Sequence, residues 1–161
     1  FPGLFEEFRR TREQWGVHVI PWRNLREIYG VLRAREMLAL LIDWGYRSDG
    51  IPVRLFDAWT ALPAGPATLA AKTGSRILPI TIHRNPDGRT FSVSWAPPIQ
   101  VPSSSPADLQ RATQAMADAF AATIAPDPTQ WYSFKPIWPA DPAERDALEA
   151  RAMTMLSSEA A

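Results

Sequence analysis

The polar side chains best suited to bind or activate a ligand stand in one loop, 43–50, which reads D-W-G-Y-R-S-D-G. Asp43 directly follows the apolar run 37–42, and Arg47 and Asp49 lie a few residues further on. Ligands of open α/β sheets bind beyond the carboxyl ends of strands, so these three side chains could orient an acceptor or hold a base. The alternative is a solvated loop with a local Arg–Asp ion pair worth less than about 1 kcal/mol. Composition alone favours the alternative.

A second candidate is a basic cluster near the start of the chain. Arg9, Arg10 and Arg12 stand among glutamates, and a guanidinium matches phosphate oxygens in a bidentate way. The other interpretation is an exposed helix face with ion pairs between residues one turn apart. Arg12 differs from its neighbours because it shares helical register with Phe8 and Trp15. An arginine on an apolar face usually has a partner.

The two histidines are candidates for a general base. His18 lies between two valines in an expected strand, and His83 closes another strand. Neither stands at a spacing from serine or aspartate that forms a known catalytic triad, so surface or structural roles are favoured. With only two histidines and no cysteine, the composition argues against a multi-histidine metal site and excludes thiolate zinc sites, disulfides and thiol nucleophiles.

Length and charge narrow the function classes further. The 161 residues suit one domain, 1–161, in which 1–125 supply sheet and helices and 126–161 a Pro/Trp-rich loop and a terminal helix. The 17 Lys+Arg residues balance 17 Asp+Glu, which argues against a nucleic-acid partner. The apolar runs all fall short of the roughly 18 residues of a membrane span.

Strands and helices are expected to alternate, which predicts an α/β fold with a mixed sheet flanked by helices. The expected helices cover 4–15, a segment opened by Asn24, 66–74, 109–124 and a segment that begins at Asp141. The expected strands cover 17–20, 37–42, 53–56, 77–83 and 90–95. The run 37–42 is continuously apolar, as in a strand covered on both faces.

Three blocks carry a family resemblance. They are L-L-I-D-W-G-Y-R-S-D-G-I-P-V-R-L-F at 40–56, L-P-A-G-P-A-T-L-A-A-K-T-G-S-R-I-L-P-I-T-I at 62–82 and Q-W-Y-S-F-K-P-I-W-P at 130–139. In this order they resemble the bacterial lipid A biosynthesis acyltransferase family, which includes lauroyl, myristoyl and phosphatidylinositol mannoside acyltransferases. The resemblance extends from Phe8 to Pro139 and implies a fold like that of the glycerol-phosphate acyltransferases.

The resemblance implies a reaction and its partners. An acyl chain would move from an acyl carrier protein or coenzyme A thioester to a hydroxyl of a membrane glycolipid, without a further cofactor or a metal. The family's base is a histidine with an acidic residue a few positions on. Neither His18 nor His83 matches that motif, so we expect it upstream of Phe1 and expect this chain to be inactive alone. The implied location is the cytoplasmic face of the bacterial inner membrane.

The resemblance also places three residues on the acceptor side. Arg12 aligns with an arginine needed near the acceptor, Asp43 with an acidic position at the end of the central strand, and Arg47 resembles an arginine of the wider glycerol-phosphate acyltransferases, one position out of register. The chain departs from the family at Trp44 and Asp57. The competing class is a non-catalytic α/β module that binds lipid or a protein partner.

Overall fold

The computed structural model describes residues 2–43 and 45–158. Contacts divide the chain into two compact units, Phe1–Ala39 and Leu40–Ala161, and each is described by itself. The first unit holds helices α1, Pro2–Gln14, and α2, Leu25–Arg33. Gly16 takes φ +76° just after α1, and the Asn24 side chain accepts a hydrogen bond from the Glu27 N–H. Both predicted helices and the predicted cap of α2 are confirmed.

Two predicted strands are wrong, and one physical reason covers both. Residues 17–20 and 37–42 have no strand structure, and Leu41 is 93% exposed while only Ile42 of the second run is buried. A strand exists through hydrogen bonds to a neighbouring backbone. The described residues offer neither segment such a neighbour, so apolar character alone did not make a strand.

The second unit begins with a buried hairpin of two antiparallel strands, β1, Ile51–Leu55, and β2, Ala58–Leu62. The register pairs Leu55 with Ala58, so Phe56 and Asp57 alone form the turn, with φ values of +50° and +64°. Two-residue hairpin turns of this kind need positive φ at both positions. The prediction placed a strand at 53–56 but missed β2.

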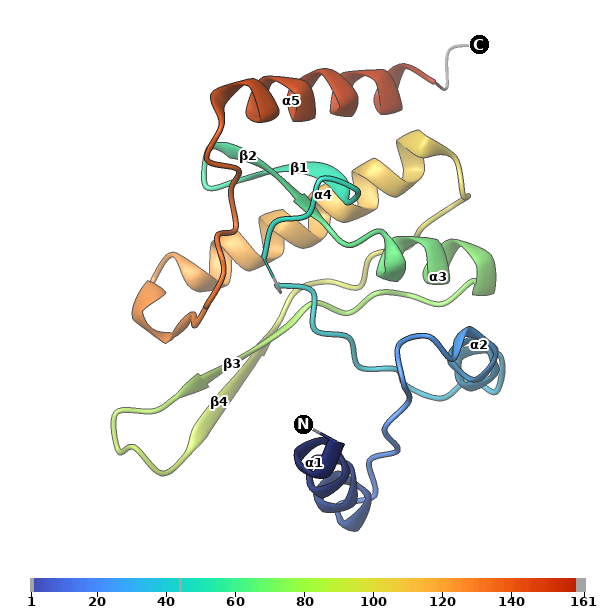
Figure 1. Cartoon of the computed structure of the whole chain (residues 1–161), viewed down its shortest axis with the longest axis vertical. Coiled ribbons are helices and arrows are strands. Elements are labelled where there is room, and N and C mark those ends of the chain that lie inside the picture. The colour runs from blue at the N-terminus through green and yellow to red at the C-terminus, as the bar shows by residue number, and fades with distance from the viewer. Residues whose placement is uncertain (1, 44, 159–161) are drawn as a thin grey trace. The chain divides into compact units, whose positions relative to one another are not determined.

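Two long helices cover this hairpin: α4, Pro106–Ile124, and α5, Pro142–Ser157. Figure 1 shows the hairpin between them. Ser105 and Asp141 cap the two helices with their side chains, and the helices expected over 109–124 and from Asp141 are confirmed. The buried residues at the centre of this packing are Ile42, Val53, Leu55, Leu62, Met116, Ala117 and Ile137.

Glutamines on α4 close the free edge of β1. The Gln114 amide accepts from the Arg54 N–H and donates to the Arg54 carbonyl, both at 2.8 Å, and Gln110 donates to the Pro52 carbonyl. The two glutamines are one helical turn apart and their partners two strand residues apart, and these two spacings nearly match. Side chains therefore take the place of a third strand at this edge.

The short helix α3, Gly65–Thr73, has proline in its first turn and ends at Gly74 in the left-handed conformation, φ +71°, as predicted for 66–74. It packs on α4 through small side chains. Their shared buried cluster is Ala67, Ala70, Val101 and Ala112. After α4 the chain makes one 3-10 turn, Pro128–Gln130.

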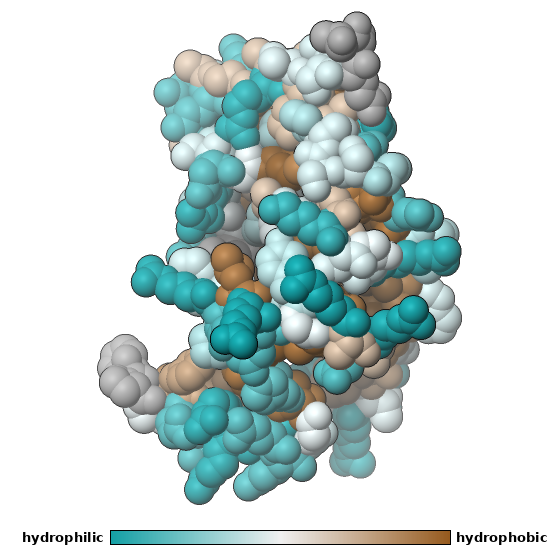
Figure 2. Space-filling model, turned by 90° about the vertical axis from the view of Figure 1, so that its right-hand side faces the viewer, coloured by the Kyte–Doolittle hydropathy of each residue, from teal (hydrophilic) through white to brown (hydrophobic). Residues whose placement is uncertain are grey.

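A second antiparallel hairpin, β3, Ile80–Arg84, with β4, Phe91–Trp95, extends away from α4 (Figure 1). It confirms the strands predicted within 77–83 and at 90–95. The α/β class is also confirmed, because the described residues form helices and two small antiparallel sheets. In place of one mixed sheet, however, the described residues form two separate antiparallel hairpins. The face in Figure 2 shows apolar side chains between long hydrophilic ones.

Candidate functional site

The loop 43–50, which the sequence analysis singled out, is held by contacts with later parts of the chain. The Tyr46 N–H donates to the Pro136 carbonyl at 2.8 Å. A Cβ at Gly45, which has φ +119°, would meet the Lys135 side chain at 2.8 Å, so this position requires glycine. The Arg151 guanidinium of α5 donates to the Ser48 carbonyl at 2.7 Å and to the Gly50 carbonyl. Residues 45–50 of the loop are thus held from two sides.

The segment 131–138 runs beside this loop and is fixed as well. The Trp138 indole N–H donates to the Leu55 carbonyl at 3.2 Å, and the buried Thr60 hydroxyl donates to the Ile137 carbonyl. The Ser133 hydroxyl donates to the Lys135 carbonyl at 2.7 Å. The backbone of this segment is therefore tied both to the buried hairpin and to itself.

Trp131 connects the segment to Asp43. Its ring lies 6.2 Å from those of Phe56 and Trp138, the latter in an edge-on arrangement, as aromatic pairs prefer. This packing fixes the indole, whose Nε1–H donates to Asp43 Oδ2 at 3.3 Å. The turn residue Phe56, with its unusual positive φ, contributes its ring to the same cluster.

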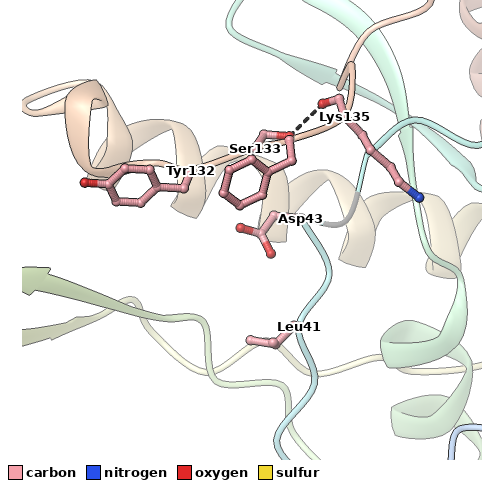
Figure 3. Close-up of a pocket in the computed structure, with 6 residues that line it drawn as sticks. Leu41, Asp43, Tyr132, Ser133 and Lys135 are labelled. Atoms are coloured by element: carbon pink, nitrogen blue, oxygen red, sulfur yellow. Dashed lines mark hydrogen bonds between the residues drawn. The ribbon is translucent and has the colours of Figure 1, made fainter. Parts of the chain in front are cut away.

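Asp43 lies at the edge of a hollow of about 230 Å³. The other lining residues are Leu41, Tyr132, Ser133, Phe134 and Lys135. In Figure 3 the Asp43 carboxylate points into the space between Tyr132 and Leu41, while the Lys135 ammonium points to the opposite side. The hollow therefore presents one carboxylate among mostly apolar atoms.

Arg47 forms its ion pair with Asp49, two residues further along the same loop. Its guanidinium makes two hydrogen bonds to the Asp49 carboxylate, at 2.9 Å and 2.6 Å. Hydrogen bonding to Arg47 lowers the pKa of Asp49. Both side chains are about two-thirds exposed, and within the described residues Arg47 makes no ion pair with Asp43. The local Arg–Asp pair, the second of the two interpretations, is therefore present.

Arg12 belongs to the first unit, where it finds its partner on its own helix. Its guanidinium carbon lies 3.1 Å from the centre of the Phe8 ring, and Nη1 is 3.4 Å from the Phe8 carbonyl oxygen. The prediction that this arginine has a partner is confirmed. Arg9 and Arg10 instead pair with glutamates one turn away, as on an exposed helix face.

Each histidine has its own local surroundings: His18 belongs to the first unit and His83 to the second hairpin. His18 Nε2 lies 2.5 Å from Glu27 Oε1, and both side chains are exposed. His83 faces the side of the second hairpin opposite its apolar residues. No group of three His, Asp or Glu side chains that could hold a metal ion occurs in the described residues, and none of their helices has the length and hydropathy of a membrane span.

Sequence reasoning found Asp43 but not the residues around it. In the sequence, the stretch 131–134 stands out only as part of a Pro/Trp-rich loop and of the block at 130–139. The signal that could have linked the two is the tryptophan of the Q-W-Y-S-F-K block, since the indole N–H of a packed, half-buried tryptophan usually finds an acceptor. The arrangement as a whole is that of an α/β protein with a fixed carboxylate beside an open, mostly apolar hollow.

Comparison with known proteins gives this arrangement a family. Residues 1–139 match the family described as bacterial lipid A biosynthesis acyltransferase. The chain is similar to a phosphatidylinositol mannoside acyltransferase of Mycobacterium tuberculosis, 30% identical over 92% of this chain and 47% of that protein. It is also similar to one of Mycolicibacterium smegmatis, 34% identical over 86% of this chain and 46% of that protein.

The chain therefore belongs to the bacterial lipid A biosynthesis acyltransferase family, as the sequence blocks indicated. It spans about half the length of the curated relatives it matches.

Proposed function

We propose that this chain forms the acceptor side of an enzyme that transfers a fatty acyl group from a thioester to a hydroxyl of a membrane glycolipid. The observation that carries the proposal is family membership over residues 1–139, combined with the fixed position of Asp43. The curated relatives are named phosphatidylinositol mannoside acyltransferases, which supports a glycolipid acceptor. The acyl transfer would take place at the cytoplasmic face of the inner membrane.

The chemistry needs a base, a nucleophile and a leaving group. A histidine oriented by an acid would take the acceptor hydroxyl proton while that oxygen attacks the thioester carbonyl carbon. The tetrahedral intermediate would collapse with loss of the thiolate of the acyl carrier protein or coenzyme A, which receives the proton. Neither His18 nor His83 has the implied acid spacing, so we propose that the base stands outside residues 1–161.

Within this chain we propose that Asp43, Arg47 and Arg12 contact the acceptor. Asp43 is held by Trp131 with its carboxylate pointing into the hollow, so it could accept hydrogen bonds from acceptor hydroxyls. Arg47 and Arg12 carry exposed or half-buried guanidinium groups that match phosphate oxygens, and the local partners Asp49 and Phe8 would have to share them.

The test is an acyl-transfer assay in which the histidine–acid motif is restored. A segment that carries this motif would be fused to or co-expressed with the chain. The acyl donors would be acyl-coenzyme A and acylated acyl carrier protein, each with a labelled acyl group. The acceptors would be phosphatidylinositol mannosides and a lipid A precursor. We expect transfer to at least one glycolipid, and a strong loss with Asp43→Ala. No transfer to any acceptor by the folded, restored protein would overturn the proposal, and glycolipid binding without transfer would favour the non-catalytic module.

A further inference from the structure

We propose that the hollow beside Asp43 binds a sugar ring of the acceptor, with Tyr132 and Phe134 facing the apolar side of the ring and Asp43 receiving its hydroxyls. The inference rests on the proposed function and assigns it a subsite. Tyr132 and Phe134 have no part in the roles described so far.

The first observation is that two aromatic side chains are displayed from a fixed backbone. Tyr132 is 75% exposed and Phe134 is 96% exposed. Their neighbours Trp131, Ile137 and Trp138 point inward and are held by packing and hydrogen bonds. A large exposed aromatic ring on a mobile loop would have many conformations to lose on binding. In this segment the backbone is already ordered by folding, so less conformational entropy is lost on binding.

The second observation is the state of the Asp43 carboxylate. Trp131 donates one hydrogen bond to Oδ2, and the described residues donate no other to this group. A carboxylate can accept about four hydrogen bonds. Figure 3 shows both oxygens directed toward the hollow rather than into the chain. Within the described residues, acceptor sites of this carboxylate are thus available beside the aromatic side chains.

These two features together match the chemistry of a sugar. A pyranose ring has an apolar side made of C–H groups and an edge of hydroxyls, so it can lie on an aromatic ring while it donates to a carboxylate. The hollow measures about 230 Å³, below the roughly 300 Å³ at which pockets for drug-sized ligands begin. That size suits one ring rather than an extended acyl chain.

The carboxylate also argues against the other surface that exposed aromatic rings can contact. Tyr132 and Phe134 could insert into a bilayer interface, where aromatic side chains are common. Asp43 would then be carried toward hydrocarbon and anionic headgroups, and a charged group is costly to move there. A sugar hydroxyl, by contrast, gains a charge-assisted hydrogen bond at the same place.

The test is direct binding of methyl α-D-mannopyranoside and myo-inositol to the 161-residue chain, followed by nuclear magnetic resonance. We expect shifts of the 131–135 amides. Asp43→Asn should weaken binding about tenfold, and Tyr132→Ala and Phe134→Ala about threefold to tenfold each. The matched controls are Asp57→Asn, an exposed turn aspartate, and Phe91→Ala, an exposed ring on β4. Circular dichroism and thermal unfolding check that each variant is folded.

Three results would overturn the inference. One is a folded chain that binds neither sugar. The second is equal weakening by the control variants. The third is loss of binding to phosphatidylcholine–phosphatidylglycerol vesicles, rather than to sugar, when Tyr132 or Phe134 is replaced.

The proposed function is tested separately with the restored enzyme. If Tyr132→Ala raises the KM for glycolipid and leaves the kcat unchanged, both proposals stand. If acyl transfer is untouched by Tyr132→Ala and by Phe134→Ala, only the sugar subsite fails. If sugar binds and no acyl transfer occurs, only the proposed reaction fails.

Discussion

The two hairpins of the second unit are both built from two antiparallel strands of five residues each, but one hairpin is buried and the other is exposed. In β1–β2, Val53 and Thr60 are fully buried, and helices α4 and α5 cover the strands. In β3–β4, the register places Ile80 opposite Trp95 and Ile82 opposite Val93, so these apolar side chains share one face. All four are between 49% and 70% exposed.

The contrast teaches that strand formation and strand burial are separate problems. Alternation of apolar and polar residues was enough to form β3–β4, because each strand has the other as a partner. The first hairpin is buried because α4 packs apolar side chains against its face and places a glutamine against its edge. A two-stranded hairpin without such support is marginally stable in water.

The largest expected effect comes from the same substitution made in both hairpins. Val53→Ala removes buried methyl groups and should lower the free energy of unfolding by about 2 kcal/mol. Val93→Ala removes groups that are half exposed and should lower it by less than about 0.5 kcal/mol. Urea unfolding of both variants measures the difference. Equal losses would mean that the second hairpin is covered in solution, and the comparison would break.

A smaller effect should follow from removal of the edge contacts. Gln114 bonds both backbone groups of Arg54, and Gln130 bonds both backbone groups of Arg84, at 2.7 Å and 3.2 Å. We expect Gln114→Ala to lower the free energy of unfolding by about 1–2 kcal/mol, since two hydrogen bonds are lost at the edge of a buried strand.

The matched variant at the second hairpin is Gln130→Ala. Because β3 is exposed or half-exposed along its length, whereas β1 is buried except at Arg54, the loss at β3 should stay below about 1 kcal/mol. Amide hydrogen exchange at Arg54 and Arg84 would locate each loss. Faster exchange at both positions in either single variant would show that the two edges are not independent.

Much of the helical fold was predictable, since helix ends carry local signals. Asp141 predicted the start of α5, and Pro66 and Gly74 predicted the ends of α3. Strands depend on partners that the local sequence does not specify. Residues 37–42 were predicted as a buried strand from apolar character alone, and β2 was missed because its turn, Phe56–Asp57, contains no glycine.

The candidate site divides in the same way. Asp43 was singled out from its place after an apolar run, and its role in acceptor binding stays a prediction, as do those of Arg12 and Arg47. Its hydrogen bond to Trp131 joins residues 88 positions apart, so no local pattern could have predicted it. The sugar subsite could be inferred from the two exposed rings only after this contact had placed Asp43 beside them.

The smallest expected effect concerns the turn of the second hairpin and its dependence on pH. The Asp87 carboxylate accepts hydrogen bonds from the Arg89 and Thr90 N–H groups, both at 2.9 Å, and from the Thr90 hydroxyl. These bonds favour the ionised form and lower the pKa of Asp87, chiefly through the Thr90 N–H. Its contribution to stability is therefore fully present above the ordinary aspartate pKa of about 3.9 and is lost as the pH falls through the lowered pKa.

Amide hydrogen exchange between pH 2 and pH 5, corrected for the intrinsic pH dependence of exchange, would measure this loss. We expect β3–β4 to lose protection below about pH 4, because the turn no longer holds an ionised acceptor. Asp87→Asn keeps a carbonyl acceptor and cannot titrate, so in this variant the pH dependence of β3–β4 should shrink while that of β1–β2 is unchanged. If both hairpins changed together, opening of β3–β4 would be coupled to the core around Val53, and its exposed apolar face would not make it an independent element.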